Sequence, residues 1–426
     1  MFFGGFVRPV FEAHTQQRKA MEHGSDGDSR IRIVGHPVRV SYRNKIMKNK
    51  YFAIVLFITT TVLAQKNDVP FSVTNPIALV RNSETVAIDL RGLFQNYPAL
   101  KGKALSILEK KKELVTQLID NDQDGIDDEV IFQASFKPNE TKKFIIRTSA
   151  VQRQYATVTD CRYVLPRADL AWENDRIAFR IYGSVLAGNV DNGTDVWTKR
   201  VRYPIVKKWY DGEEQNPKIS YHEDHGEGAD FFSVGRTLGA GSAGIVWNGK
   251  LIQQGLFNNF RIITAGPIRT SFEVYYSDMK LDSFKTLTIK QVTLDAGDQM
   301  NRITERYVTA STTESLTVRT GIVKRKFTAP YRSADGQIHS LWGLTTTDTL
   351  NGLLGTAVIV PRKNTTTFED SVHCFITTAI KTHQQFTYFS GAAWSRMGDI
   401  TTEEQWNRYL EQYLGRLQAP LSVAFH

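Results

Sequence analysis

Most of the chain alternates between apolar and polar residues with a period of two, which is typical of β-strands with one buried face. Segments such as EVIFQASF (129–136), KTLTIKQVTL (285–294) and NRITERYVTA (301–310) are also rich in β-branched and aromatic residues. Turn-forming sequences separate them, for example DNG at 191–193 and SADGQ at 333–337. The pattern predicts a mainly β fold, a large antiparallel β-sandwich with a small N-terminal β domain and few helices.

One segment near the C-terminus has a helical pattern instead. TTEEQWNRYLEQYLGRL (401–417) begins with Thr401 and Thr402, either of which can cap a helix. Glu403 and Glu404 follow and suit the positive end of the helix dipole. We therefore predict an amphipathic helix whose apolar face contains Trp406, Tyr409, Leu410 and Tyr413.

The N-terminal part contains the pattern of a secretory signal. MKNKYFAIVLFITTTVLAQKND, which starts at Met47, has a basic head, a short apolar run and small residues after it. The apolar run is too short to span a bilayer. We assign residues 47–64 to a signal peptide and expect residues 1–46 to be a mis-assigned leader outside the fold. Residues 65–155 are predicted to form the small β domain with an acidic loop, and residues 156–426 the large β-sandwich. The mature chain is expected to be periplasmic or secreted, without a membrane span.

The charge of the chain does not favour a nucleic-acid partner. Residues 1–50 contribute +6 of the formal net charge of +9, which leaves +3 on residues 65–426. Binding of nucleic acid requires a clustered basic face, whereas an anionic small substrate requires only a few local cations. The two cysteines, Cys161 and Cys374, allow either a disulfide or two buried free thiols.

An acidic segment, DNDQDGIDDE (120–129), lies between two predicted strands. Alternate Asp residues can direct carboxylate oxygens to one centre, and Gly125 permits the tight turn that a calcium loop requires. The twelfth position is Ile131, so the bidentate Glu of an EF-hand is missing. The segment predicts either a structural calcium loop or a solvated turn, since Asp and Gly are ordinary turn residues. The calcium ligands would be Asp120, Asp122, Asp124 and Asp128.

Aromatic and cationic residues alternate from Trp172 to Arg269. Aromatic rings are suited to the apolar faces of sugars, and Arg or Lys to a uronate carboxylate or a sulfate ester. Taken one by one, the aromatics are more often core residues and the cations more often protect a sheet edge. As a group, they predict a site for an anionic carbohydrate, with substrate-binding residues Trp197, Lys199, Arg200, Tyr203, Lys208 and Arg236.

The segment YHEDHGEGAD (221–230) concentrates titratable groups within this region. In an extended chain His222 and His225 would lie on opposite faces, so they converge only if the chain turns at its glycines. Two chemistries remain open. The imidazoles could ligate a metal with Glu227 or Asp230, or a carboxylate could orient one imidazole for proton transfer. The glycine-rich stretch VGRTLGAGSAG (234–244) matches no nucleotide-binding motif and is expected to allow close backbone approach.

The blocks WENDRIAFRIYG, YHEDHGEGADFF, VGRTLGAGSAGIVWNGKL and VTLDAGDQMNRI resemble an uncharacterised family of exported bacterial proteins from polysaccharide-utilisation loci. The resemblance covers most of residues 70–420. One branch of that family resembles an ulvan oligosaccharide dehydratase, which removes water from a non-reducing-end uronic acid. KTLTIKQVTLDAGDQMNRITERYV also resembles paired strands of the galactose-mutarotase-like supersandwich.

This resemblance implies a carbon–oxygen lyase that forms a 4,5-unsaturated uronate and requires no cofactor for its chemistry. It implies a cation on the substrate carboxylate, Arg202 or Arg180, and a base, His222 or His225. The acid would be Tyr221 or the other histidine, with Glu227 or Asp224 orienting the base.

Two other classes of function remain open. A glycoside hydrolase would pair Glu173 or Asp175 with Glu227 or Asp230. A non-catalytic carbohydrate-binding protein would need only the aromatic residues. The sequence predicts neither the sugar nor the oligomeric state.

Overall fold

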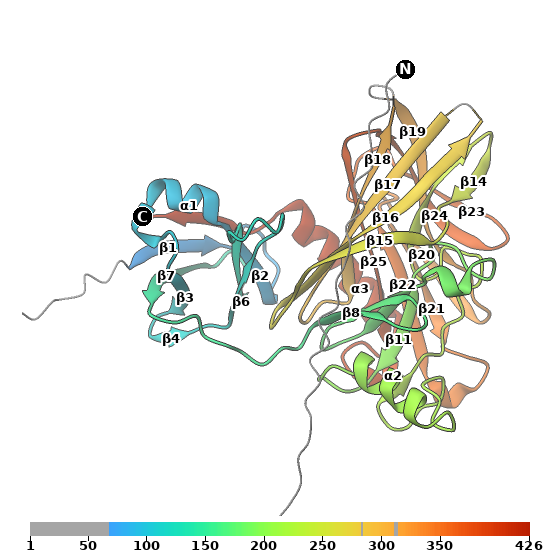
Figure 1. Ribbon diagram of the computed structural model, residues 1–426, viewed down its shortest axis with the longest axis horizontal. Helices are drawn as coiled ribbons and strands as arrows, with labels where there is room; N and C mark the ends of the chain where they lie inside the picture. The colour runs from blue at the N-terminus through green and yellow to red at the C-terminus, as the bar shows by residue number, and fades with distance from the viewer. Residues whose placement is uncertain (1–67, 283, 311–313) are drawn as a thin grey trace, which may run out of the picture. The chain divides into compact units, whose positions relative to one another are not determined.

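The computed structural model describes residues 68–282, 284–310 and 314–426. It is mainly β, as the sequence predicts, with antiparallel pairing between its named strands (Figure 1). The predicted leader (1–46) and signal peptide (47–64) lie outside the described residues. Within the described part of the chain, no helix is long and apolar enough to cross a membrane.

The N-terminal region contains two small sheets that share one apolar core. Asp89 caps the short helix α1 (Leu90–Asn96) by accepting hydrogen bonds from the backbone of Arg91 and Gly92. One sheet has the order β26-β1-β7-β3-β4, and the other has the order β2-β6-β5. Their strands are β1 (Val69–Thr74), β2 (Arg81–Asp89), β3 (Ala104–Glu109), β4 (Lys112–Glu113), β5 (Thr116–Ile119), β6 (Glu129–Phe136), β7 (Thr141–Ser149) and β26 (Ser422–Phe425).

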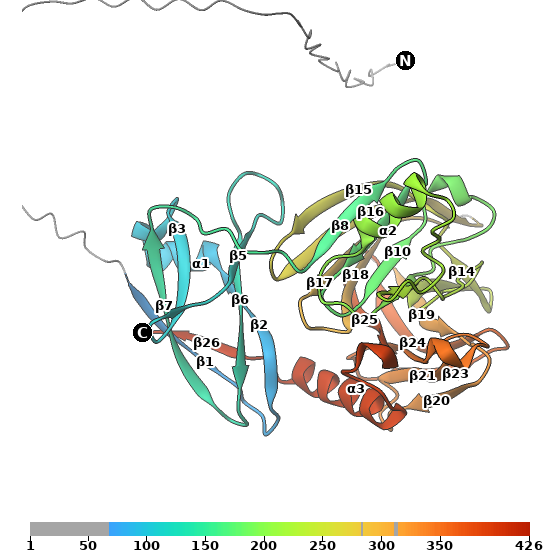
Figure 2. The same cartoon turned by 90° about the horizontal axis from the view of Figure 1, so that it is seen from below.

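The last strand, β26, belongs to a sheet of the N-terminal region, whereas the sequence predicts that all of residues 156–426 form the large β-sandwich. β26 pairs with β1, with Phe425 opposite Phe71 (Figure 2). The rings of Phe71 and Phe425 lie 5.7 Å apart, and Val423 packs on the N-terminal core. The backbone pairing with β1 and the partial burial of Val423 hold the end of the chain on its first sheet, although Phe425 is 37% exposed.

The large β-sandwich consists of an eight-stranded and a five-stranded sheet around one apolar core. Figure 1 shows the long strands β16, β17 and β18 running side by side in the larger sheet. Its order is β15 (Phe257–Ala265), β16 (Arg269–Leu281), β17 (Phe284–Asp295), β18 (Met300–Thr309), β25 (Gln385–Trp394), β22 (Leu353–Ile359), β21 (Ile338–Leu344) and β20 (Thr328–Arg332). The smaller sheet has the order β14 (Lys250–Gln253), β13 (Ser242–Trp247), β19 (Ser315–Val323), β24 (His373–Lys381) and β23 (Thr366–Glu369).

The predicted C-terminal helix is confirmed as α3 (Glu403–Gln418), which Thr402 caps through its hydroxyl. Trp406, Leu410 and Tyr413 of this helix are buried against the eight-stranded sheet. Cys161 and Cys374 are both buried free thiols and do not form a disulfide.

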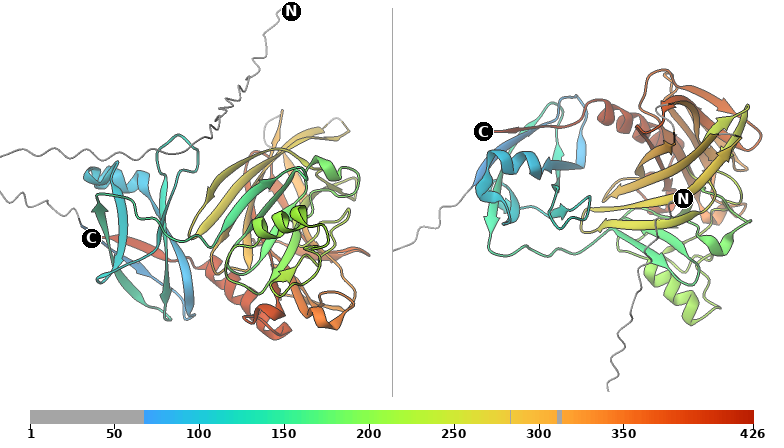
Figure 3. Two further views of the ribbon diagram at one scale, coloured as in Figure 1. Left: turned by 60° about the horizontal axis from the view of Figure 1, so that its bottom comes forward. Right: turned by 45° about the horizontal axis from the view of Figure 1, so that its top comes forward.

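A further five-stranded sheet carries the residues of the candidate site. Helix α2 (Val206–Gln215) packs on it through Val206 and Tyr210, which share a small core with Trp197 and Tyr221 (Figure 3). The sheet order is β12 (Gly228–Ala229), β11 (Asp195–Lys199), β10 (Ala178–Ile181), β9 (Asp169–Glu173) and β8 (Asp160–Val164).

Candidate active site

The centre of the candidate site is the buried guanidinium of Arg180 on β10. Strand pairing places Arg180 directly opposite Asp195 of β11. Its Nε and Nη2 atoms donate to Asp195 Oδ2 at 3.0 and 2.6 Å, and Nη2 also donates to Asp230 Oδ2 at 2.7 Å. Asp169 Oδ2 lies 3.9 Å from Nη1. Nη1 donates to the Tyr221 hydroxyl at 3.1 Å.

This cluster contains more negative than positive charge. Three buried carboxylates, those of Asp169, Asp195 and Asp230, surround one guanidinium. Burial, and then the neighbouring Asp195 carboxylate, raise the pKa of Asp230 well above its ordinary value, although Arg180 opposes this shift. Burial also raises the pKa of Asp169. Since perturbed carboxylates gather at functional sites, the surplus acid makes this cluster a candidate.

The cluster opens into a cavity of about 480 Å³. Asp169 and Asp230 each have one carboxylate oxygen, Oδ1, with no hydrogen-bond partner among the described residues. Buried polar atoms are normally paired, so these two enclosed oxygens add to the cost of burying the cluster. Polar side chains that line the cavity are Arg167, Asp169, Arg180, Tyr182, Tyr221, His222, Asp230 and Ser233.

His222 lies at the mouth of this cavity, with its side chain 56% exposed. Its Nδ1 is 3.1 Å from the Asp230 carbonyl oxygen and 3.4 Å from Asp230 Oδ2. Because both atoms are acceptors, Nδ1 carries the proton and donates. Nε2 has no hydrogen-bond partner in the described part of the chain. With the proton on Nδ1 alone, Nε2 presents a lone pair, which is the arrangement of a general base oriented by a carboxylate.

The chain reaches this geometry because it turns between residues 224 and 228. Asp224 Oδ1 accepts the backbone N–H groups of Gly226 and Gly228 at 2.8 and 3.0 Å. Gly228 has φ of 121°, and a Cβ there would lie 2.0 Å from the Thr198 carbonyl oxygen. Only glycine fits this contact. Asp224 therefore shapes the loop and does not orient an imidazole, contrary to expectation.

His225 lies apart from His222 and lines a second cavity, of about 870 Å³, between α2 and the loop. Its Nε2 donates to the Ser220 carbonyl oxygen at 3.0 Å. Tyr221 lines both cavities. Within the described residues, the two histidines with Glu227 or Asp230 do not form a group of metal-ligand atoms within 4.8 Å of one another. The structure therefore contradicts the metal alternative for this motif.

Comparison with known proteins identifies the family. A model described as a domain of unknown function, DUF4861, matches residues 73–423. The chain belongs to the DUF4861 family. An uncharacterized protein P7 of Formosa agariphila is 29% identical to it over 374 residues, which are 83% of this chain and 92% of that protein.

Two solved structures show a distant likeness to this DUF4861 chain. An α-mannosidase and a protein of glycosyl hydrolase family 38, both from Enterococcus faecalis, match with TM-scores of 0.45 at 9% identity. The matches cover 84% of this chain but 46% and 47% of those chains, so the chain spans about half their length. A likeness at this level supports no conclusion about fold or activity.

Two residues predicted to bind substrate are core residues of the DUF4861 fold. Lys199 is fully buried, and its Nζ donates to Glu173 Oε2 at 2.6 Å and to the carbonyls of Asn174 and Tyr203. All three of its N–H groups are used, so none remains for a ligand. Trp197 is also fully buried and stacks on Tyr221 at 4.7 Å. Both predictions are wrong because all five residues of β11 are buried, and α2 with the loop after it covers the face that carries Trp197.

Glu173 is also unavailable for hydrolytic chemistry. It is fully buried, and its Oε1 accepts the backbone N–H groups of Ile205 and Val206 at 2.7 Å, where α2 begins. The predicted carboxylate pair that includes Glu173 is therefore wrong. Asp175 contacts Arg176 and Arg202 and accepts the Gly297 N–H at 2.6 Å.

Glu227 lies on the larger cavity in a network with α2. It accepts from Lys208 Nζ at 2.6 Å, from Trp209 Nε1 at 3.1 Å and from the Tyr203 hydroxyl. Partial burial acts to raise the pKa of Glu227, but these hydrogen bonds outweigh it and lower the pKa. Glu227 is therefore a stable anion that does not contact His222, so its predicted role in orienting the base is contradicted.

The remaining predicted cations form ion pairs near the protein surface. Arg200 contacts Asp224 and lies 5.1 Å from the Trp394 ring, and Arg202 pairs with Asp399 at 2.7 Å. Arg236 pairs with Asp191 at 3.3 Å. These three side chains do not line either of the two cavities.

Several residues of the cluster and its cavity were not predicted from the sequence. Asp169 and Asp195 lie on β9 and β11, Tyr182 directly follows β10, and Arg167 lies in a turn. Asp195 contacts Arg180, and the other three line the cavity. Asp230 was considered only as a metal ligand or a hydrolase carboxylate. The alternation of β9, β10 and β11 could have indicated that these charges face one another across the sheet, because paired strands present the same face.

The acidic loop keeps both of its predicted states open. Asp120, Asp122 and Asp124 bring carboxylate oxygens within 4.8 Å of one another, as a calcium loop requires. Asp128 lies outside that group and accepts the Asn121 N–H at 2.8 Å. Asp120 also accepts the N–H groups of Gln123 and Gly125, as in an Asx-type turn.

Proposed function

We propose that this chain is a carbon–oxygen lyase that dehydrates the non-reducing-end uronic acid of an anionic, ulvan-type oligosaccharide. One observation carries the proposal: His222 has a free Nε2 at the mouth of a cavity, while Asp230 anchors its Nδ1. The resemblance of the sequence blocks to a dehydratase branch supports the substrate class. An exported location, expected from the segment 47–64, fits a polymeric substrate.

The reaction follows from this geometry. The C5 proton of the uronate lies α to the carboxylate and is the acidic one. His222 Nε2 takes this proton, and the electron pair forms the C4=C5 bond. The C4–O bond breaks, and an acid gives its proton to the departing hydroxyl, which leaves as water. The product is a 4,5-unsaturated uronate.

Arg167 is the cation best placed for the substrate carboxylate. It lines the cavity and lies over the Tyr221 ring at 5.3 Å, with its side chain 44% exposed. Its contact with Glu213 leaves part of the guanidinium accessible. A guanidinium binds a carboxylate in bidentate fashion and stabilises the enolate-like charge that develops. Arg180, in contrast, is enclosed by carboxylates and tyrosines and positions Asp230.

Tyr221 is the proposed acid. Its hydroxyl accepts a hydrogen bond from Arg180 Nη1 and retains its own proton for donation. Burial raises the pKa of Tyr221, although Arg180 opposes this shift. The phenol therefore stays protonated at neutral pH until the leaving hydroxyl takes its proton.

A hydrolase is the second candidate, since two carboxylates with raised pKa values, Asp169 and Asp230, line the same cavity. Incubation with uronate oligosaccharides separates the functions through ultraviolet absorbance and chain length. The proposal predicts rising absorbance of the unsaturated uronate at constant chain length, lost in His222→Ala and retained in His225→Ala. Chain shortening without absorbance would indicate hydrolysis, and neither change would indicate a binding protein.

A further inference from the structure

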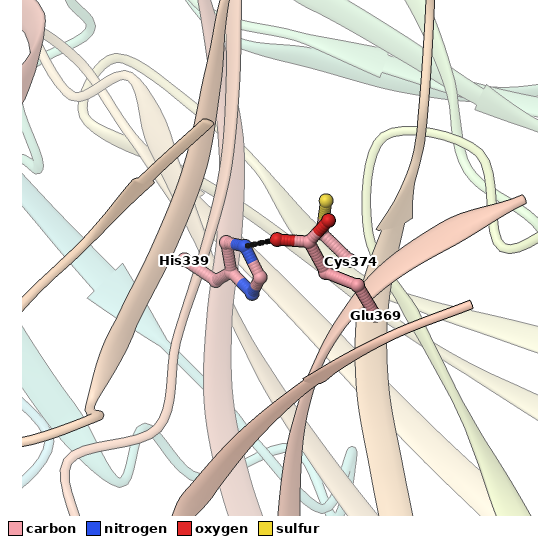
Figure 4. A group of neighbouring side chains, drawn as sticks. All are labelled: His339, Glu369 and Cys374. Carbon is pink, nitrogen blue, oxygen red and sulfur yellow. Dashed lines mark ion pairs between the residues drawn. The ribbon is translucent and has the colours of Figure 1, made fainter. Parts of the chain in front are cut away.

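A group of three metal-ligand side chains, of which His339 and Cys374 are buried and Glu369 is half-buried, shares no residue with the candidate active site. His339 lies on β21 of the eight-stranded sheet, and Glu369 and Cys374 lie on β23 and β24 of the five-stranded sheet. One potential ligand atom from each residue lies within 4.8 Å of the others. Figure 4 shows the imidazole directed at one oxygen of the Glu369 carboxylate, with the Cys374 sulfur drawn beside the other oxygen. We propose that these residues bind a zinc-type divalent ion that links the two sheets.

The protonation of His339 is set by its backbone contact. Its Nδ1 lies 3.2 Å from the Phe375 carbonyl oxygen, and a carbonyl only accepts, so Nδ1 carries the proton. Nε2 then holds a lone pair. His339 is fully buried, and Nε2 has no hydrogen-bond partner in the described residues. A ligating histidine commonly donates its other N–H to a backbone carbonyl in this way.

The free lone pair faces a second acceptor. Nε2 lies 3.5 Å from Glu369 Oε1. Hydrogen bonds from Lys324 and Arg332 lower the pKa of Glu369 to about 2, so this carboxylate is ionised and accepts only. Burial lowers the pKa of His339, which opposes a proton on Nε2. A metal ion coordinated by both groups would satisfy two acceptors that otherwise oppose each other.

Cys374 completes the ligand set. Burial raises the pKa of this thiol to about 12, so a metal ion must displace its proton on binding, which releases one proton to solvent. Imidazole nitrogen, thiolate sulfur and carboxylate oxygen are the donors that zinc takes, and three protein ligands leave one position for water. The new thiolate also offsets the positive charge of Lys324 and Arg332. Zinc would thereby add an inter-sheet link to the contact between His339 and the Phe375 carbonyl.

Cobalt substitution tests the site in the full chain. The metal-free protein is titrated with Co²⁺, and thiolate-to-cobalt charge transfer is followed in the ultraviolet. The proposal predicts the charge-transfer band, with about one ion bound tightly per chain. The band should be lost in Cys374→Ser and His339→Gln. It should persist in Cys161→Ser, the matched control at the other buried cysteine, and in Asp122→Asn of the acidic loop.

If the folded protein shows no charge-transfer band after Co²⁺ is added, the proposal is overturned and the contact is a thiol–imidazole hydrogen bond only. If Cys374→Ser or His339→Gln fails to fold, thermal unfolding of the unmodified protein decides the question. Zinc should raise the Tm relative to chelator-treated protein, and by the same amount in Cys161→Ser. Equal Tm values with zinc and with chelator would also overturn the proposal.

Discussion

Two buried charge clusters lie on the sheet that contains β9, β10 and β11, and they differ in their balance of positive and negative charge. In one, Lys199 directs all its N–H groups to Glu173 and two carbonyls, and Glu173 in turn accepts two backbone N–H groups at the start of α2. In the other, Arg180 faces three carboxylates. Two of these, Asp169 and Asp230, line a cavity, and each has an enclosed oxygen, Oδ1, without a hydrogen-bond partner among the described residues.

The difference separates a structural from a functional use of buried charge. The Lys199–Glu173 pair is neutral, enclosed and fully hydrogen-bonded, so it holds α2 on the sheet. The Arg180 cluster carries surplus negative charge that does not favour folding. Such a cost is typical of a site that must hold a base and a substrate. The comparison therefore predicts opposite effects of substitution at the two clusters.

The largest effect is expected from His222→Ala. Turnover of a uronate oligosaccharide should fall by about 10²–10⁴-fold, because the variant lacks the proton acceptor. The free energy of unfolding should change little, since the side chain is more than half exposed. Steady-state kinetics and denaturant unfolding measure the two quantities. His225→Ala is the matched control, and unchanged turnover in His222→Ala would refute the assignment.

Lys199→Met should lower the free energy of unfolding by about 3–5 kcal/mol, because it leaves the buried Glu173 carboxylate without its counter-ion. Guanidinium unfolding monitored by circular dichroism measures the loss. The double variant with Glu173→Gln should recover most of the stability, since both charges are then absent. A single-variant loss below about 1 kcal/mol would show that the pair is not the support of α2.

Asp230→Asn should separate activity from stability. The pKa of Asp230 is raised by burial and Asp195, so the folded state holds this proton more tightly than the unfolded state. Stability from this group is therefore full at acid pH and is lost as pH rises through the folded pKa. In Asp230→Asn the free energy of unfolding should depend less on pH. Relative to the unmodified protein, the variant should be about 1 kcal/mol more favourable at pH 8 than at acid pH, while its turnover falls. Denaturant unfolding at both pH values is the measurement; a steeper slope in the variant would contradict the charge surplus.

The smallest effect is expected from Arg236→Ala. Its ion pair with Asp191 is exposed, so the free energy of unfolding should change by less than about 0.5 kcal/mol. Turnover should also stay unchanged, because Arg236 lines neither of the two cavities described. Steady-state kinetics and denaturant unfolding of the variant test both statements. A tenfold rise in KM would show that Arg236 binds the substrate after all.

Much of the fold could be predicted because alternation over long strands specifies which face is buried. The helix at 403–418 followed from its cap and apolar stripe. The pairing of β26 with β1 could not be predicted, since a four-residue strand carries too little pattern and its partner is remote in sequence.

The candidate site was predicted only in part. The concentration of acids and imidazoles in 221–230 pointed to His222, but the position of Asp230 depends on a turn that Gly228 allows. Lys199 and Trp197 were misassigned because residue identity alone does not show whether a cation or an aromatic ring in a strand faces the core or the solvent. Arg180 acquires its surroundings from three separate strands and the loop, which only tertiary structure assembles.

Chemical rescue tests the central claim most directly. Imidazole in solution is added to His222→Ala, and formation of the unsaturated uronate is followed by ultraviolet absorbance. If Nε2 of His222 is the base, imidazole should restore turnover in proportion to its concentration and to its unprotonated fraction. If turnover stays at the variant's level at every imidazole concentration while His222→Ala still binds the oligosaccharide, His222 is not the group that removes the proton.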